Sequence, residues 1–229
     1  MILADKILHF NRSLSLKAVL PNNIEVLNPF SGENEAVVWP AVQTFYRKYY
    51  SDNNSRHLIL GINPGRLGAG STGLPFTDTK RLNEACGISF NAFTTHEPSS
   101  VFVYDVIAAF GGPEAFYRQF YIGSVCPLGF VTPGKTGMVN INYYDDKELQ
   151  KAVTPFIVDS INRQIDFGLN RGKIFVLGTG KNFKFLDKLN AQHHFTRELV
   201  ALEHPRFIMQ YRAKQKEDYI AKYLRLLSA

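Results

Sequence analysis

Short apolar runs that lead into glycine-containing loops constrain the fold of this chain most strongly. One run covers residues 57–60 and stops at Gly61, another lies in YIGSV at 121–125, and a third covers 173–177 before Gly178. Runs of this length, bounded by glycine, are typical of buried strands. Helical patterns lie between them, and strands that alternate with helices indicate a parallel sheet covered on both faces.

The remaining elements fit the same α/β class. Helical periodicity predicts helices over 4–16, 37–50, 113–120, 145–169 and 211–227, and residues 199–203 form a fourth strand candidate. The apolar segment 102–110 suits either a strand or a helix. Residues 1–229 are enough for one domain with a full core. We therefore expect a single α/β domain over 1–229, with a central, mostly parallel four-stranded sheet and helices on both faces.

Several classes of protein are disfavoured by composition. No run of about 18 apolar residues predicts a membrane span, and the N-terminus, with Asp5, Lys6 and His9, does not resemble a signal peptide. The 2 cysteines and 6 histidines show no metal-ligand spacing. The expectation is a cytoplasmic protein with no metal, no cofactor and no membrane partner.

The charge balance permits a polyanionic partner. The net charge is +6 and the pI is near 9.2, which is compatible with binding to nucleic acid but does not demonstrate it. Lysine and arginine are enriched in the predicted C-terminal helix. That helix could contact phosphates, or it could simply present a solvated face.

The loop GINPGRLGAGSTGLPF, residues 61–76, has five glycines in sixteen residues. The part from Gly65 to Thr72 nearly fits a phosphate-binding loop of nucleotide hydrolases, but Ser71 stands where that loop needs lysine. Gly73 and Pro75 also break any helix after the loop. A nucleotide hydrolase is therefore disfavoured, and a purely structural loop remains an alternative.

The segment LVALEHPRFIMQYR, residues 199–212, places His204 directly after the last strand candidate. Histidine before proline is unremarkable by itself, and a structural histidine would then be the favoured interpretation. Loops at the carboxyl ends of parallel strands, however, build the sites of α/β proteins. Histidine in such a loop suits stabilisation of a developing anion near neutral pH.

These two segments together resemble the uracil-DNA glycosylase superfamily, and within it the single-strand-selective monofunctional family. The loop from Asn63-Pro64-Gly65 to Thr72-Gly73-x-Pro75-Phe76 is similar to that family's motif 1 without a gap, and EHPRF resembles its motif 2. The mid-chain segment FYRQFYIGSVCPLGF and the segment from Val26 to Tyr50 are also similar. The resemblance implies a repair enzyme that flips a damaged base out of DNA and hydrolyses its glycosidic bond.

Two departures indicate a divergent branch of bacterial type. Ser124 stands where the family usually has asparagine, and Arg206 stands where serine usually follows the His-Pro of motif 2. The first difference concerns which base is read, and the second concerns the wedge that enters DNA. The reader of the base is thus either Ser124 or an amide of the following loop, Asn140 or Asn142.

The resemblance also implies roles for individual residues. Asn63 would orient the attacking water, and His204 would donate a hydrogen bond to the base oxygen that gathers charge. Contacts with the flipped base are expected from Ile62, Gly65, Phe76, Ser124 and Asn140, with Phe76 stacking on it. The backbone N–H groups near Ile62 and Phe76 are further candidate donors.

DNA contacts are expected around motif 2. Phe207, Ile208 and Met209 either form an apolar wedge that fills the gap left by the flipped base or pack in the core. Arg206, Arg212 and Lys214 would hold phosphates. No lysine lies inside the His-Pro motif or the Asn-Pro-Gly motif to form a Schiff base, so a monofunctional enzyme is expected. A monomer is also expected. The alternative is a non-catalytic DNA-binding module of the same fold.

Overall fold

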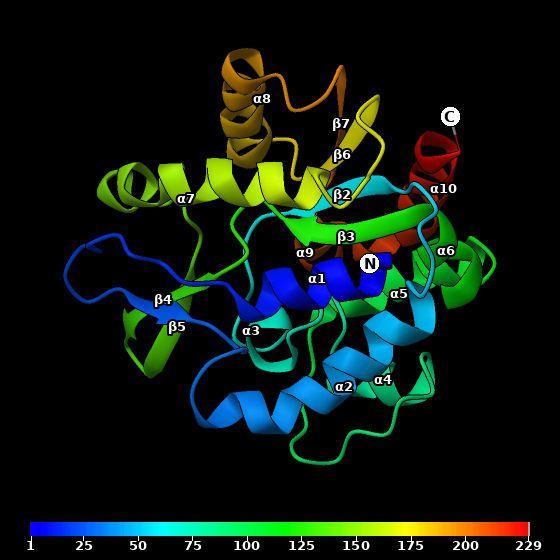
Figure 1. The fold of residues 1–229 in the computed structure, drawn as a ribbon, viewed down its shortest axis with the longest axis horizontal. Helices are drawn as coiled ribbons and strands as arrows, with labels where there is room; N and C mark the ends of the chain where they lie inside the picture. The colour runs from blue at the N-terminus through cyan, green and yellow to red at the C-terminus, as the bar shows by residue number, and fades with distance from the viewer. Residues whose placement is uncertain (229) are drawn as a thin grey trace.

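Two sheets organise the protein in a computed structural model that describes residues 1–228. The central sheet has four parallel strands in the order β3-β2-β6-β7 (Figure 1). A smaller antiparallel sheet has the order β1-β4-β5. The strands are β1 (Glu25–Leu27), β2 (His57–Gly61), β3 (Phe120–Ser124), β4 (Gly129–Gly134), β5 (Gly137–Ile141), β6 (Lys173–Leu177) and β7 (Glu198–Leu202).

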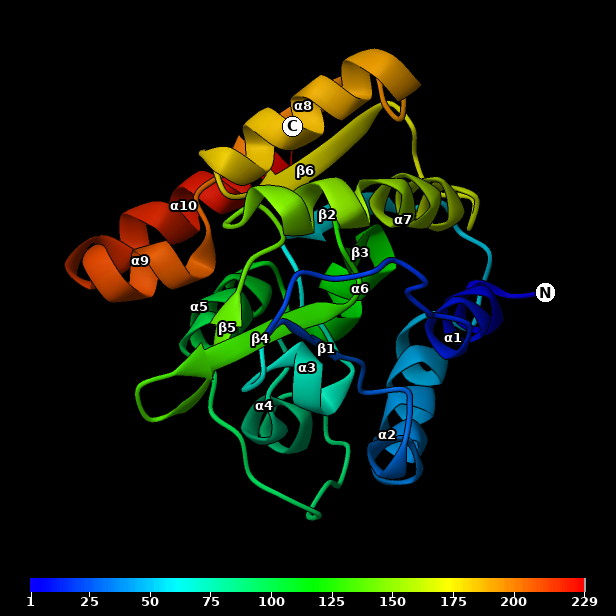
Figure 2. The same ribbon diagram turned by 90° about the vertical axis from the view of Figure 1, so that its left-hand side faces the viewer.

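Helices pack around the central sheet. They are α1 (Leu3–Arg12), α2 (Glu33–Tyr49), α3 (Ala69–Thr72), α4 (Thr79–Glu84), α5 (Pro98–Ala109), α6 (Pro113–Gln119), α7 (Lys147–Ile165), α8 (Lys181–His193), α9 (Pro205–Tyr211) and α10 (Lys216–Leu227), with a 3₁₀ turn at Ala213–Gln215. The β2-to-β3 crossover runs in the opposite direction to the β3-to-β6 and β6-to-β7 crossovers. Right-handed connections therefore place α7 and α8 on one face and α5 and α6 on the other (Figure 2).

The predicted class and the four-stranded sheet are confirmed. All four predicted strands are present, and β2, β3 and β6 are almost completely buried, as continuous apolar runs require. The ambiguous segment 102–110 is part of α5, which has Pro98 in its first turn. Motif 1 contains a single helical turn, α3, which ends at Gly73 with φ of 73°.

Two features differ from the prediction. The small sheet was not expected, because β1 has only three residues and pairs with β4, which lies far away in sequence. The predicted helix over 211–227 begins later, because α10 starts at Lys216 after a 3₁₀ turn, and residues 205–211 form a separate helix, α9, that was not predicted. The two helices are separated at Arg212, whose φ of −132° and ψ of 21° leave the helical region.

The register of the sheet brings functional loops together. Gly61 pairs with Ser124, and Leu177 pairs with Leu202, so neighbouring strands end at the same level. The loop after β3 is bonded to the loop after β2, because Val125 N–H donates to the Gly61 carbonyl at 2.9 Å. Loops 62–76, 125–128, 178–180 and 203–204 therefore meet at one edge of the sheet.

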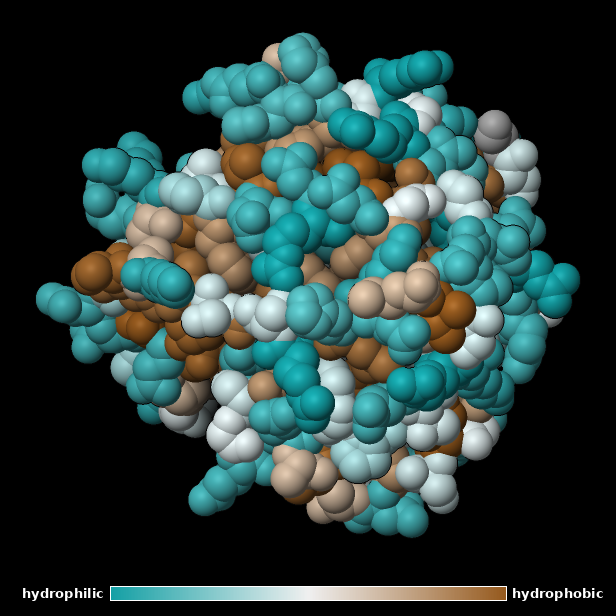
Figure 3. Space-filling model, viewed as in Figure 1, coloured by the Kyte–Doolittle hydropathy of each residue, from teal (hydrophilic) through white to brown (hydrophobic). Residues whose placement is uncertain are grey.

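The outer surface is mostly hydrophilic on the face seen in Figure 3, and its hydrophobic areas form separate patches. Within residues 1–228, no helix is long and apolar enough to cross a membrane.

Candidate active site

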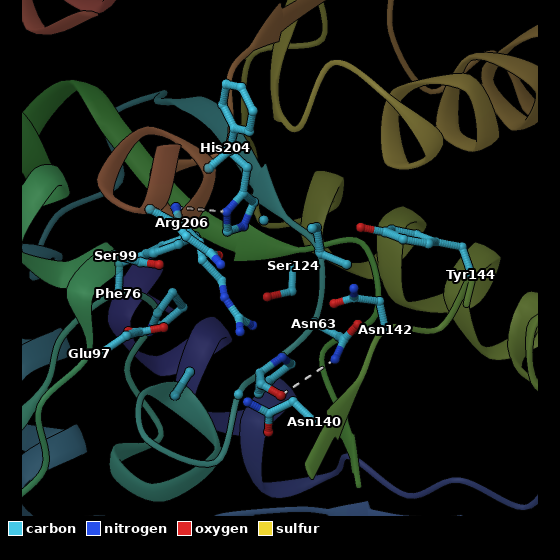
Figure 4. Close-up of a pocket in the computed structure, with 18 of the residues that line it drawn as sticks. Asn63, Phe76, Glu97, Ser99, Ser124, Asn140, Asn142, Tyr144, His204 and Arg206 are labelled. Carbon is cyan, nitrogen blue, oxygen red and sulfur yellow. Dashed lines mark hydrogen bonds between the residues drawn. The ribbon is translucent and has the colours of Figure 1, made fainter. Parts of the chain in front are cut away.

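A pocket of about 340 Å³ opens at the carboxyl edge of the central sheet. Nine of the residues singled out from the sequence line it together, although they come from four separate parts of the chain (Figure 4). They are Ile62, Asn63, Gly65, Phe76, Ser124, Asn140, His204, Arg206 and Phe207.

Asn63 follows β2 and is held by backbone groups of the segment after β5. Its Oδ1 accepts a hydrogen bond from Tyr143 N–H at 3.2 Å, and its Nδ2 donates to the Ile141 carbonyl at 3.4 Å. These bonds fix the plane of the amide. An amide oxygen has two lone pairs, so Oδ1 can still accept a hydrogen bond from a water molecule in the pocket.

The two candidate amides have different environments, and only Asn142 lies in a loop, because Asn140 belongs to β5. Asn140 Oδ1 accepts from Arg66 N–H at 3.0 Å, which turns Nδ2 toward Gly65. A Cβ atom at Gly65 would lie only 3.3 Å from that Nδ2. The Asn142 amide is instead bonded to Asp145, with Nδ2 at 2.8 Å from Oδ2. Asn140 is therefore the amide whose donor group faces the Asn-Pro-Gly loop.

Phe76 is buried and has a left-handed backbone conformation, with φ of 51°. Such a conformation costs a residue other than glycine about 1–3 kcal/mol, and it is found most often at functional sites. The ring packs over Gly61, where a Cβ atom would come within 3.1 Å of it. The Phe76 N–H donates to no acceptor within residues 1–228, which leaves it available to a bound ligand.

Ser124 is the last residue of β3 and projects into the pocket between His204 and Asn63 in Figure 4. Its carbonyl accepts a hydrogen bond from Gln164 Nε2 at 3.1 Å, which holds the backbone from behind. The side chain is 8% exposed. A single hydroxyl thus occupies the place of the longer amide that the family resemblance led us to expect.

His204 begins α9 and is also its N-cap. Its Nδ1 accepts a hydrogen bond from Arg206 N–H at 3.1 Å, so the proton of the neutral ring is on Nε2. Burial, and secondarily the positive charge of Arg206, lower the pKa of His204 to about 4. At neutral pH the ring is therefore an uncharged donor through Nε2, beside the Phe76 ring at a centroid distance of 5.8 Å.

Helix α10 supports this histidine from behind. The Tyr223 hydroxyl donates to the Glu203 carbonyl, and Lys222 Nζ lies 2.7 Å from Glu203 Oε1. Lys216 is bonded to Asp105 of α5 at 2.8 Å. Two of the C-terminal lysines thus bind protein carboxylates, so α10 positions motif 2 as well as carrying charge.

Glu97 and Arg206 are the only charged side chains lining the pocket among the described residues. The pKa of Glu97 is raised to about 7, mainly by burial and in part by the charge of Asp78, whereas the Ser100 hydrogen bond and the charge of Arg206 oppose the rise. The carboxylate packs on Gly68, where a Cβ atom would lie 2.3 Å from it. Sequence reasoning missed Glu97, because it belongs to no motif. Its position directly before Pro98, at the start of an apolar helix, was the available signal.

The proposed wedge needs a correction. Ile208 is completely buried and packs in the core, so it cannot reach DNA. Met209 is half-buried against the core, whereas Phe207 is 40% exposed and lines the pocket. Residues four apart share a helix face, and Tyr211 accordingly lies beside Phe207 with ring centroids 5.6 Å apart. Arg212 and Lys214 are exposed outside the pocket.

Comparisons with known proteins agree with this arrangement. A model of the uracil DNA glycosylase superfamily matches residues 47–228, which is more than half of the chain. The crystal structure of wild-type SMUG2 from Pedobacter heparinus is similar, with 52% identity and a TM-score of 0.96, over 100% of this chain and 97% of that one. A search of curated proteins gave no match. The chain therefore belongs to the uracil DNA glycosylase superfamily, and it is a uracil-DNA glycosylase enzyme that acts on DNA in base-excision repair.

Proposed function

We propose that the protein hydrolytically releases uracil from DNA and leaves the strand uncut. The observation that carries this proposal is the placement of Asn63, Phe76 and His204 around one pocket, with His204 held as a neutral Nε2–H donor. The sequence also suggests a monomer that works in the cytoplasm on DNA with a damaged base, in single or double strands. Release of free uracil from a labelled oligonucleotide, unaffected by EDTA, is the direct test.

The chemistry follows from where charge develops. The nucleotide leaves the base stack at a cost of a few kcal/mol and enters the pocket, where Phe76 would stack on the base. The C1′–N bond then breaks, its electron pair passes to the base, and positive charge builds on the sugar. His204 would donate its Nε2–H to the base oxygen that becomes negative. A water molecule oriented by Asn63 would bond to C1′, and its proton would pass through solvent to the departing base anion, which leaves as the neutral base.

The neutral state of His204 suits this role. A donor placed at a developing oxyanion is worth about 3–4 kcal/mol, and it acts without being charged beforehand. Asn63 has no titratable group, so it can orient water but cannot remove its proton. We therefore propose an enzyme that relies on stabilising the departing base more than on activating the water.

Base selection in this proposal depends on Ser124. A hydroxyl is one rotor that either donates or accepts, whereas an amide offers a fixed donor and a fixed acceptor. Uracil and xanthine present the same order of oxygen, N–H and oxygen, while cytosine reverses the first two groups. We propose activity on uracil first, and on xanthine second where the pocket admits the larger ring, with Asn140 as an additional amide facing the Asn-Pro-Gly loop.

Ser124→Asn should narrow the range of bases toward uracil. The longer amide would supply a fixed donor for one uracil oxygen and would take space that a purine needs. We expect the ratio of uracil to xanthine release to rise, measured as single-turnover rates on oligonucleotides that differ only in the target base. Ser124→Ala is the matched control, because it removes the hydroxyl without adding an amide. Unchanged ratios in both variants would mean that residue 124 does not read the base.

Phe207 is the proposed wedge. Phe207→Ala should reduce activity on a duplex more than on single-stranded DNA, because only a duplex leaves a gap in the stack after the base is flipped. Phosphate contacts by Arg206, Arg212 and Lys214 are part of the same proposal. Single-turnover rates on duplex and on single-stranded DNA are measured for Phe207→Ala. Met209→Ala is the control, because its side chain packs against the core. Equal losses on the two substrates for Phe207→Ala would contradict a wedge.

A further inference from the structure

A second groove, of about 690 Å³, lies between α7 and α8 on the face of the sheet opposite α5. In Figure 1, α8 rises steeply away from α7, and the residues that line the groove belong to these two helices and to the segment just before α7. Its lining consists of Tyr144, Asp145, Lys147, Gln150, Lys151 and Thr154 from one side, and Lys181, Lys184, Phe185, Lys188, Leu189 and Gln192 from the other.

The groove is strongly basic. Five lysines line it, and Asp145 is the one acidic side chain that does so. Lys181 lies 3.6 Å from that carboxylate, whereas the other four lysines form no ion pair within residues 1–228. Lys147 and Lys151 are four residues apart on α7, and the three lysines of α8 follow a spacing of three and four. Each set therefore points along one face of its helix.

The groove adjoins the active-site pocket at Tyr144, whose side chain lines both cavities. The connection is rigid. The Tyr143 hydroxyl donates to Asn182 Oδ1 at 2.6 Å, and its ring packs on Phe185 with centroids 5.0 Å apart. Asn63 is bonded to the Tyr143 N–H from the other side. The segment that holds Asn63 thus also fixes the start of α8.

We propose that this groove binds the backbone of single-stranded DNA as the strand leaves the active-site pocket. The proposal rests on the proposed function, since it needs a nucleotide in that pocket. Unpaired lysines match the negative charge of phosphates, and the partly buried Phe185 offers an aromatic surface in the floor.

The dimensions set how much DNA is held. Lys181 and Lys188 are seven residues apart, which corresponds to about 10 Å along α8. Phosphates are spaced about 3.4 Å per strand along the axis of a duplex, and an unstacked strand is more extended, so this side of the groove spans at most about three of them. In this proposal the strand is held on one side of the flipped nucleotide only, because Tyr144 is the one residue that lines both the pocket and the groove.

Charge removal tests the proposal with a matched control. Lys184→Ala/Lys188→Ala removes two charges from the groove, and Lys17→Ala/Lys80→Ala removes two exposed charges that line neither cavity. The probes are undamaged single-stranded oligonucleotides, and oligonucleotides with uracil near the 5′ or the 3′ end. Affinity is measured between 50 and 200 mM salt, and single-turnover release at saturation checks that each variant keeps an intact site.

We expect the affinity of Lys184→Ala/Lys188→Ala for the oligonucleotides to depend less on salt than the affinities of the wild type and of Lys17→Ala/Lys80→Ala. Each phosphate contact contributes about 0.7 to the logarithmic salt slope for a single strand. Wild-type affinity should therefore fall about sevenfold more than that of Lys184→Ala/Lys188→Ala over this range. The loss of affinity should appear only when the strand extends on one side of uracil.

The proposal would be overturned if the groove and control variants showed equal slopes of affinity against salt. It would also be overturned if the loss of affinity were the same whether the strand extends 5′ or 3′ of uracil. Absence of uracil release by the wild-type protein is a separate result, which would contradict the proposed function. Binding of the undamaged oligonucleotides is measured independently of that release.

Discussion

His204→Ala is expected to lower the single-turnover rate of uracil release by about 10²–10³-fold, because one donor to a developing oxyanion is worth that much. The His204 ring should contribute no inflection at the usual histidine pKa near 6.5, and any inflection near pH 7 that comes from Glu97, whose pKa is about 7, should disappear in Glu97→Gln. Burial and Arg206 lower the pKa of His204 to about 4, so the neutral Nε2–H donor persists through the range from pH 5.5 to 8. A single-turnover pH profile on one oligonucleotide measures both effects.

His204→Asn separates catalysis from helix capping. Asparagine is a good N-cap, so this variant should keep the bond to the Arg206 N–H while losing the long reach of the ring. The folded pKa of His204 lies below its unfolded value. Its contribution to stability is therefore full above about pH 6.5 and is lost as pH falls toward 4. His204→Asn should lack that contribution to the pH dependence. Full activity in His204→Asn would show that the ring is only a cap.

Asn63→Ala is expected to lower the single-turnover rate by about 10²-fold, the size of effect produced by misplacing a reacting group by about 1 Å. Two losses combine in this variant. The water loses its acceptor, and Tyr143 N–H and the Ile141 carbonyl lose the amide that holds them. Thermal unfolding measured beside the rate shows how much of the loss comes from the loosened segment.

Asn63→Asp distinguishes the two roles of Asn63. The carboxylate keeps an acceptor for Tyr143 N–H, loses the donor to Ile141, and can remove a proton from water. We expect it to retain more activity than Asn63→Ala and to add a rise in rate with pH as the carboxyl group ionises. If both substitutions reduced the rate equally, with no new pH dependence, Asn63 would act only by holding residues 141–143.

The sequence was most informative where the physical signal is local. Buried parallel strands need continuous apolar runs, and β2, β3 and β6 were found from theirs. The strand β1 gives no such signal, because it is short and its partner β4 is about a hundred residues away. Helix α9 was not predicted, because its seven residues are too few for helical periodicity to stand out and they lie inside motif 2.

The site residues also fall into those with a local sequence signal and those without one. Asn63, Phe76 and His204 lie in loops whose composition is unusual, and motif similarity located them before their geometry was known. Glu97 and Tyr144 reach the pocket only through tertiary packing, so no local pattern marks them. Ile208 was placed in the wedge because three apolar residues in sequence were read together. Helical geometry turns Ile208 inward and leaves Phe207 and Tyr211 on the outer face.

The backbone at Phe76 has a consequence for engineering more stable variants. Glycine would adopt the φ of 51° at this position without steric cost, but it would leave a cavity where the buried ring packs in the core. Loss of a buried phenylalanine side chain costs about 3–5 kcal/mol, which exceeds the roughly 1–3 kcal/mol cost of the left-handed conformation. A design rule that places glycine wherever φ is positive would therefore lower both thermal stability and base release here, because one ring fills the core and lies beside His204.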